Sequence, residues 1–394
     1  MAAGVGTPGG NTQRPLYGNA GDLVRLDPTT LRPLRGRRVP LDSDTWAWSF
    51  SPDRSRLVLV SDSPGPELRL VDLRRMKLMG DARLARRGSA WATAWVSPRR
   101  ILAVVVTPRD DTIVAGVDPG SRRVLWRRRL GGSLQVGERL RRSLVLVLGP
   151  RGRIDGSRFV RVTPAGRLHS TSLPEIRSGA ERRGTGTPLE SRPGLAIDRS
   201  GGRAFVVQAG GPVAEVDLRT FLVRSHALHF GGRTPDPVPH GTRDALWLGR
   251  GLLAVTGFDS HFSAGTGDSP GRSWTTPAGL ALIDVHSWSG RTIDDRATAA
   301  ARVGGTLLAS SFVESARGPS GSGVTGYSRA GTRRFHRYGD APLGVEPLGR
   351  RALVAGLSMV ALMDPRTGSE LRRFRRLPAS PIDRDQSFPP TVGG

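Results

Sequence analysis

The sequence contains no cysteine, a single lysine (Lys77) and only two asparagines (Asn11 and Asn19) among its 394 residues. Without cysteine the chain can form no disulfide, no thiolate metal site and no cysteine nucleophile. The absence does not identify the compartment, because a cysteine-free chain suits oxidising and reducing surroundings alike. No apolar run approaches the ~18 residues that a membrane-spanning helix needs, so we expect a protein that does not span a membrane.

Strong bases, by contrast, are in large excess. Lys+Arg total 59 against 34 Asp+Glu, which gives a formal net charge of +25. Such a charge can attract an anionic polymer or surface over a long range. The scarcity of lysine and asparagine is also typical of a GC-rich genome, and both interpretations of the arginine excess remain open. No RNA-recognition motif, helix-turn-helix or basic helix accompanies the charge, so we expect no sequence-specific nucleic-acid binding.

A repeated β-hairpin runs through the chain. It consists of a short strand, a tight turn and a second strand, as in VAEVDLRTFLV. The residues that begin these turns are Asp27, Asp72, Asp118, Thr163, Asp217, Asp284, Ser328 and Asp364. A side-chain oxygen at the start of a turn accepts a nearby backbone N–H. This predicts a turn function for these residues rather than a ring of metal ligands.

A second kind of hairpin, rich in small and β-branched residues, lies between the first kind. Two hairpins together make a four-stranded module of roughly 45 residues, as in propeller blades. The sequence therefore predicts an all-β fold, a single β-propeller with seven four-stranded blades. Eight blades are the alternative, because eight outer hairpins accompany seven inner ones. We place the propeller at residues 22–377, between flexible segments at 1–21 and 378–394.

The SPD turn at residues 51–53, its shorter form at 97–98 and the VD-turn units resemble the YVTN/WD-repeat-like β-propellers over about residues 22–374. The unit VDPGSRRVLW, which contains Trp126, is similar to a quinoprotein repeat. The resemblance implies the propeller fold and an extracytoplasmic location, although residues 1–11 lack the basic and apolar regions of a signal peptide. It implies no single activity, because propellers host many functions.

The two faces of the predicted disc carry different connections. If the strands of a blade are labelled A to D from the centre outward, the A-to-B and C-to-D turns share one face, here called the short-turn face. The B-to-C and D-to-A connections share the other, here called the insertion face. The long insertions all fall on the insertion face, at residues 177–192, 230–242, 259–277 and 314–323. Because binding residues tend to lie on loops held by a rigid scaffold, we expect binding on the insertion face.

The candidate binding residues precede or begin inner strands, or belong to the 259–277 insertion. They are Asp44, Trp46, Trp91, Arg243, Asp244, Asp259, His261 and Asp340. The tryptophans could stack on a planar or sugar ligand, or they could fill space between blades. Asp259 and His261, with Asp268, could serve metal or acid–base chemistry; the alternative is a solvated Gly/Ser loop. We assign no metal site and no cofactor.

The short-turn face is predicted to carry a basic ring. Its candidate members are Arg54, Arg56, Arg99, Arg100, Arg122, Arg123, Arg141, Arg142, Arg350 and Arg351. Aspartates in the same turns reduce the positive charge without cancelling it. The ring could attach the protein to an anionic polymer or surface, or arginine could simply solubilise exposed turns.

No Walker loop, HExxH or GxSxG motif in a strand–turn–helix setting is present, so no catalytic residue is assigned. We expect a non-catalytic, monomeric propeller that binds a protein or a small ligand on its insertion face. One alternative is an enzyme of the lactonase or quinoprotein kind, with Asp244, Asp259 and His261 at the funnel. Attachment through the basic face is the other alternative.

Overall fold

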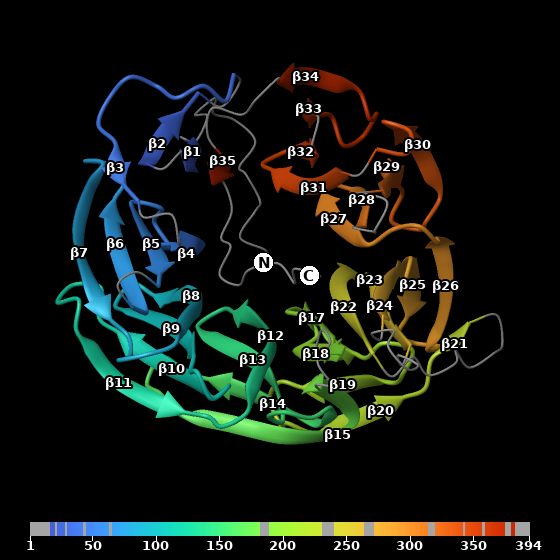
Figure 1. Ribbon diagram of the computed structural model, residues 1–394, viewed down its shortest axis with the longest axis horizontal. Coiled ribbons are helices and arrows are strands. Elements are labelled where there is room, and N and C mark those ends of the chain that lie inside the picture. The colour runs from blue at the N-terminus through green and yellow to red at the C-terminus, as the bar shows by residue number, and fades with distance from the viewer. Residues whose placement is uncertain are drawn as a thin grey trace.

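The computed structural model describes residues 16–19, 22–27, 30–41, 45–62, 65–181, 189–230, 240–263, 272–313, 320–341, 343–356, 359–374 and 380–382. In these ranges the regular elements are strands, so the predicted all-β class is confirmed. No helix in this part of the chain has the length and apolar character that crossing a bilayer requires. The sheets follow one another around a common centre, which is the arrangement of a β-propeller (Figure 1).

In the described part of the chain, five sheets consist of four strands in chain order. The first two contain β4 (Thr45–Phe50), β5 (Arg56–Ser61), β6 (Glu67–Asp72) and β7 (Lys77–Arg83), then β8 (Ser89–Ser97), β9 (Arg100–Val106), β10 (Thr112–Val117) and β11 (Val124–Arg129). The third contains β17 (Gly194–Asp198), β18 (Arg203–Val207), β19 (Val213–Asp217) and β20 (Val223–His226). The last two contain β27 (Ala299–Val303), β28 (Thr306–Val313), β29 (Ser320–Tyr327) and β30 (Arg333–Arg337), then β31 (Leu343–Leu348), β32 (Arg351–Gly356), β33 (Val360–Met363) and β34 (Glu370–Phe374).

A further four-stranded sheet closes the ring. Its order is β3 (Val39–Pro40), β2 (Asp22–Leu26), β1 (Leu16–Asn19) and β35 (Ser380–Ile382). β1 and β35 pair antiparallel, with Tyr17 opposite Ile382, and the pairing removes an edge that an open ring would expose. These two strands lie outside the predicted propeller limits of 22–377. The rest of 1–21 and 378–394 lies outside the described residues.

The largest sheet has eleven strands. Its members are β12 (Ser133–Leu140), β13 (Ser143–Gly149), β14 (Asp155–Val162), β15 (Leu168–Glu181), β16 (Leu189–Arg192), β21 (His229–Phe230), β22 (Gly241–Gly249), β23 (Leu252–Ser263), β24 (Arg272–Pro277), β25 (Leu280–Asp284) and β26 (Ser289–Asp294). β16 pairs antiparallel with β15 and parallel with β22, and so joins two sets of strands. The expectation of seven, or eight, separate four-stranded blades is therefore wrong, because part of the 177–192 insertion forms this joining strand.

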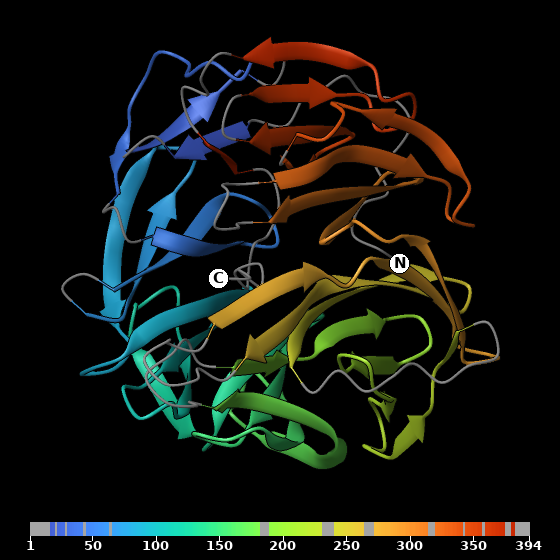
Figure 2. The ribbon, with the colours of Figure 1, turned by 45° about the vertical axis from the view of Figure 1, so that its right-hand side comes forward.

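The apolar core lies between neighbouring sheets, which stack against one another around the ring (Figure 2). β9 shows how one strand serves two interfaces. Ile101, Ala103 and Val105 are buried against the preceding sheet, and Leu102 and Val104 against the following one. Successive side chains of a strand point to opposite faces. A strand that lies between two sheets therefore has an uninterrupted apolar sequence.

Arginine side chains also join neighbouring blades, by donating to backbone carbonyls. Arg127 Nε donates to Leu84 O at 2.6 Å, and Arg161 Nη1 donates to Leu218 O at 2.7 Å. Arg25 Nη2 makes the same kind of bond to Leu73 O at 2.8 Å. Part of the arginine excess therefore has an internal function, which the net charge alone does not reveal.

The predicted turn hydrogen bonds are confirmed for every turn-start residue. Each accepts at least one backbone N–H at 2.6–3.1 Å; the acceptors are Asp27, Asp72, Asp118, Thr163, Asp217, Asp284, Ser328 and Asp364. Within the described ranges, no group of three or more His, Asp or Glu side chains is placed to hold a metal ion. The aspartates therefore repeat because the turns repeat.

Candidate functional site

A hollow of about 580 Å³ opens on the insertion face, where two inner strands begin beside the 177–192 insertion. Its wall is formed by Gly88, Ser89, Trp91, Val106, Thr107, Pro108, Asp110, Ser133, Leu134, Gln135, Gly179, Ala180, Glu190 and Arg192. Trp91, near the start of β8, is the member that the sequence singled out. Gly88 and Ser89 lie just before it, and the others come from the end of β9 and the β9–β10 turn, the start of β12, the end of β15 and β16.

Two glycines fix the shape of this hollow. Gly88 has φ +118°, and a Cβ there would lie 2.5 Å from Val106 O. Gly179 has φ +130°, and a Cβ there would collide with Arg153 O. Glycine tolerates this left-handed conformation and leaves room for a close backbone approach. A side chain at either position would therefore force the backbone beside the hollow to move.

A buried ion cluster supports the turn beside the hollow. Asp111 is fully buried, accepts from Arg129 Nε at 2.8 Å and also pairs with Arg151. The Asp111 N–H donates to Thr107 Oγ1 at 3.1 Å, and the Asp110 N–H donates to Thr107 O at 2.9 Å. Because a buried carboxylate needs paired partners, the cluster holds the turn that presents Thr107 and Asp110 to the hollow.

The insertion strand β16 adds charge to the wall and connects it to another blade. Arg192 Nε and Glu190 Oε2 form an ion pair at 3.0 Å. Arg192 lies opposite Thr242 in the parallel β16–β22 pairing. The hollow is therefore built from segments that are far apart in the sequence, and it adjoins the strand that carries Arg243.

The wall has the mixed chemistry of a small-ligand site. Trp91, Leu134 and Val106 supply apolar surface, and Gln135 with the hydroxyls of Ser89, Thr107 and Ser133 supplies neutral hydrogen-bonding groups. Ligand pockets in proteins combine apolar lining with a few placed polar groups in this way. Such a wall suits a ligand that has one apolar face and several hydroxyl groups.

Arg243 and Asp259, both predicted as binding residues, bind each other. Arg243 Nη2 lies 2.5 Å from Asp259 Oδ1, and Arg243 Nη1 donates to Phe258 O at 2.8 Å. Arg243 is buried. These contacts hold the start of β22 against β23, so the guanidinium is used inside the fold.

His261 lies on an extension of β23 that pairs with β24. Its ring stacks on Trp274 with centroids 5.4 Å apart, and its Nε2 lies 2.8 Å from Thr276 Oγ1. The described part of the 259–277 insertion is therefore a β-hairpin, and the expectation of a solvated loop is wrong there. Asp268 lies outside the described residues.

The remaining candidates of the insertion face are dispersed. Asp340 is exposed and pairs with Arg296 at 2.7 Å. Asp244 is half-buried in β22, and the backbone of Trp46 belongs to β4. Asp44 lies outside the described residues. Among the described candidates, Trp91 is the one that lines the hollow.

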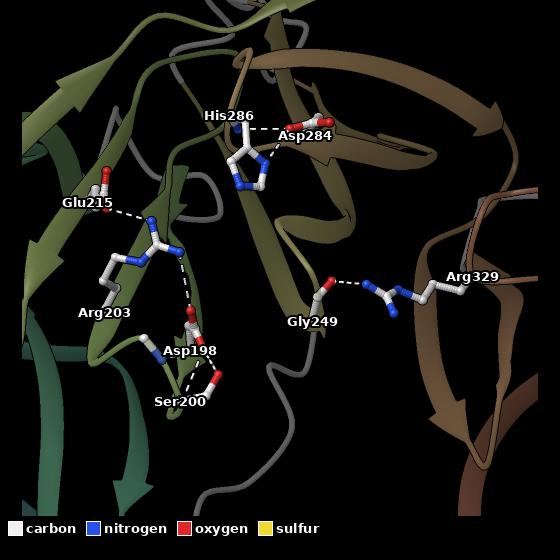
Figure 3. Close-up of polar contacts among 9 residues, drawn as sticks. Asp198, Ser200, Arg203, Glu215, Gly249, Asp284, His286 and Arg329 are labelled. Atoms are coloured by element: carbon white, nitrogen blue, oxygen red, sulfur yellow. Dashed lines mark hydrogen bonds and ion pairs between the residues drawn. The ribbon is translucent and has the colours of Figure 1, made fainter.

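Several arginines of the short-turn face have partners within the ring (Figure 3). Arg329, between β29 and β30, donates to the carbonyl of Gly249 in another blade. Arg203 bridges Asp198 at 3.3 Å and Glu215 at 3.1 Å. These contacts show that arginine on this face is in part a structural residue.

The predicted basic-face arginines lie in turns or beside strand ends on the short-turn face. Arg54 lies 4.3 Å from the centroid of the Phe50 ring, and Arg141 Nη2 lies 3.5 Å from Arg199 O. The exposed members are Arg99, Arg122, Arg123, Arg141, Arg142 and Arg350, and the half-buried ones are Arg54, Arg56, Arg100 and Arg351. Six of the ten predicted members are therefore exposed to solvent.

Trp126, the residue of the quinoprotein-like unit, fills space between blades. Its ring lies against Gly116 and Gly166, where an added Cβ would collide with it or press on it. Its Nε1 donates to Pro164 O at 3.2 Å. Pro164 lies in the turn between β14 and β15, so this tryptophan ties its own blade to the next one.

No protein-family model matches the chain, and no curated protein has a matching sequence. The structure is similar to dihydro-heme d1 dehydrogenase NirN in complex with DHE, with a TM-score of 0.61 and 12% identity over 93% of this chain and 74% of that chain. The Cps50 (Swd1) β-propeller domain of Myceliophteria thermophila has a TM-score of 0.43 and 14% identity, covering 83% of this chain and 95% of that chain. BamB of Moraxella catarrhalis has a TM-score of 0.40 and 11% identity, covering 92% and 87%.

At these identities the similarity shows the fold alone. The chain is a β-propeller protein.

Proposed function

We propose that this propeller is a non-catalytic binding protein whose ligand occupies the hollow at Trp91. The observation that supports it best is the convergence of an aromatic ring, an amide and several hydroxyls on a hollow of about 580 Å³. Its ligand class is a polar molecule with one apolar face, such as a sugar, because such a molecule stacks on an aromatic ring and hydrogen-bonds at its edge.

The candidate acid–base residues are held in contacts within the fold, and this favours binding over catalysis. Asp259 is paired with Arg243, and His261 contacts Thr276 and Trp274. A general acid or base must reach a substrate proton, whereas these side chains support strand pairing. The enzyme alternative therefore has less support from the geometry than the binding alternative.

The test is a binding screen followed by substitution at the hollow. Monosaccharides and oligosaccharides are screened by saturation-transfer NMR against the full chain, and the strongest ligand is titrated into Trp91→Ala and Gln135→Ala. We expect Trp91→Ala to weaken binding by about tenfold or more, since stacking and apolar contact at a ring are lost.

Trp274→Ala is the matched control, because Trp274 is 49% exposed on the same face but does not line the hollow. It should change the affinity by less than about twofold, as expected for a residue that shares no contact with the ligand or with Trp91. Equal losses in the two tryptophan variants, or a screen without any ligand, would contradict the proposed function.

We also propose that the hairpins of this ring are repeats of the YVTN type. The hydrogen bonds of the SPD turn support the repeat type: Ser51 Oγ donates to Asp53 Oδ1 at 2.6 Å.

A further inference from the structure

The short-turn face has a hollow of its own, of about 660 Å³. It is lined by Gly305, Thr306, Arg334, Asp364, Arg366 and Thr367. The first two come from the β27–β28 turn and the start of β28, and Arg334 comes from β30. The other three come from the β33–β34 turn, so the hollow lies where two neighbouring blades meet.

The β27–β28 turn differs from its counterparts in the described part of the chain. The turns that join an inner strand to the next strand elsewhere contain Arg54, Arg99, Arg141, Arg142, Arg199, Arg250 or Arg350. This turn is Gly304-Gly305, and a Cβ added at Gly305 would meet no atom within 4 Å. Without an arginine side chain in this turn, an open space remains. Arg334 of β30 and Arg366 of the β33–β34 turn border it.

The two bordering arginines are held in different ways. Arg334 Nη1 donates to the buried Thr306 Oγ1 at 3.1 Å, which fixes its guanidinium at the hollow. Arg366 is exposed, and its guanidinium has no partner among the described residues. The Arg366 N–H donates to Asp364 Oδ1 at 2.7 Å. Two guanidinium groups against one carboxylate leave the lining with a positive excess.

We propose that this hollow binds an oxyanion, the phosphate or sulfate group of a small anion or of a polymer. A guanidinium presents parallel N–H donors whose spacing matches the oxygens of such a group, and these charge-assisted bonds are stronger than neutral ones. Arg366 has all of its side-chain donors available, and Arg334 retains those that do not bind Thr306. The site lies on the face opposite the Trp91 hollow, so it does not depend on the function proposed there.

Calorimetric titration of the full chain with inorganic phosphate, at constant ionic strength, tests the site. We expect Arg366→Gln to bind about tenfold more weakly, since a hydrogen bond to a charged group is lost. Gly305→Gln should abolish binding by filling the hollow. Because Gly305 has open space and no left-handed φ, this variant should fold normally. Asp364→Asn should bind more tightly, because it removes the negative charge and keeps an oxygen for the Arg366 N–H.

Arg142→Gln is the matched control, because Arg142 is exposed on the same face and its loss changes the net charge equally. It should change the affinity by less than about twofold, since surface charges farther apart than a Debye length are screened. Equal weakening in Arg142→Gln and Arg366→Gln, unchanged binding in Gly305→Gln, or no phosphate binding by the wild type would overturn the proposal. Affinity for polyphosphate that rises with chain length would identify a polymer as the source, and equal affinity would identify a free anion.

Discussion

The SPD turn shows what side-chain oxygens do at the ends of the blades. Ser51 Oγ and Ser55 Oγ donate to the two carboxylate oxygens of Asp53, each at 2.6 Å, and the Arg56 N–H donates to Ser51 Oγ at 2.9 Å. The hydrogen bond from Ser51, followed by that from Ser55, lowers the pKa of Asp53 from 3.8 to about 2. The Ser-Pro-Asp sequence of this turn therefore has a local physical cause, because its side chains hydrogen-bond one another.

This lowered pKa predicts a pH dependence at one residue. Because the folded-state pKa lies below the unfolded value, the ionised Asp53 stabilises the turn above about pH 4, and that stabilisation is lost as the pH falls through about 2. Ser51→Ala should move the pKa of Asp53 upward toward 3.8, since it removes the largest cause of the shift. Carboxyl chemical shifts followed by NMR titration measure it; an unchanged midpoint in Ser51→Ala would show that this hydrogen bond is not the cause.

The strands were the most predictable elements of the chain. Alternation and turn residues indicate a hairpin from local sequence alone, so turn-start residues such as Asp217 could be assigned before their hydrogen bonds were known. β16 could not be predicted in this way, because it exists through pairing with β15 and β22, and Arg192 meets Thr242 across about 50 residues of sequence. The seven-blade expectation failed at this joining strand.

The face of the propeller that carries the candidate site was easier to predict from the sequence than the residues that line it. Trp91 stood out because tryptophans gather at the starts of the inner strands, whereas Gln135 and Thr107 are ordinary residue types that only the fold brings together. Conversely, Arg243 and Asp259 looked like site residues because both are charged and near the funnel. The sequence could not show that strand pairing places them 2.5 Å apart.

Arginine bonds between blades should contribute measurably to stability. Arg161 Nη1 donates to Leu218 O at 2.7 Å, and its guanidinium lies 5.0 Å from the centroid of the Phe221 ring. Arg161→Met keeps the apolar stem but loses the hydrogen bond, so we expect it to lower the free energy of unfolding by about 1–2 kcal/mol. Urea denaturation measures the change. Arg350→Met, at an exposed turn, is the control and should stay within about 0.5 kcal/mol of the wild type.

At the scale of the whole molecule, the arginines that give the net charge of +25 have several separate functions. Some arginines bind backbone carbonyls between blades, as Arg127 and Arg329 do. Others, such as Arg142, are exposed on the short-turn face, and Arg366 borders the proposed oxyanion site. The net charge is a sum over these groups, so it could not by itself indicate a partner.

Ring closure should be needed for the stability of the whole propeller. Deleting residues 380–394 removes β35 and leaves the β1 edge without its partner strand. We expect a lower thermal midpoint and concentration-dependent association, because an unpaired strand edge can pair with another chain. Thermal unfolding and light scattering measure the two effects. A chain with alanine at residues 383–394 retains β35 and is the control; if both variants lost stability equally, the β1–β35 pairing would not be the cause.

The β1–β35 pairing also constrains how the protein is made. A strand near residue 17 must wait for a partner near residue 382 until the residues between them have left the ribosome. At translation speeds of about 5–20 residues per second, that delay is on the order of tens of seconds. Any blades that form during this interval leave the edge of β1 without β35. The ring therefore cannot close through this pairing before residue 382 has been synthesised, and the edge of β1 stays without this partner until then.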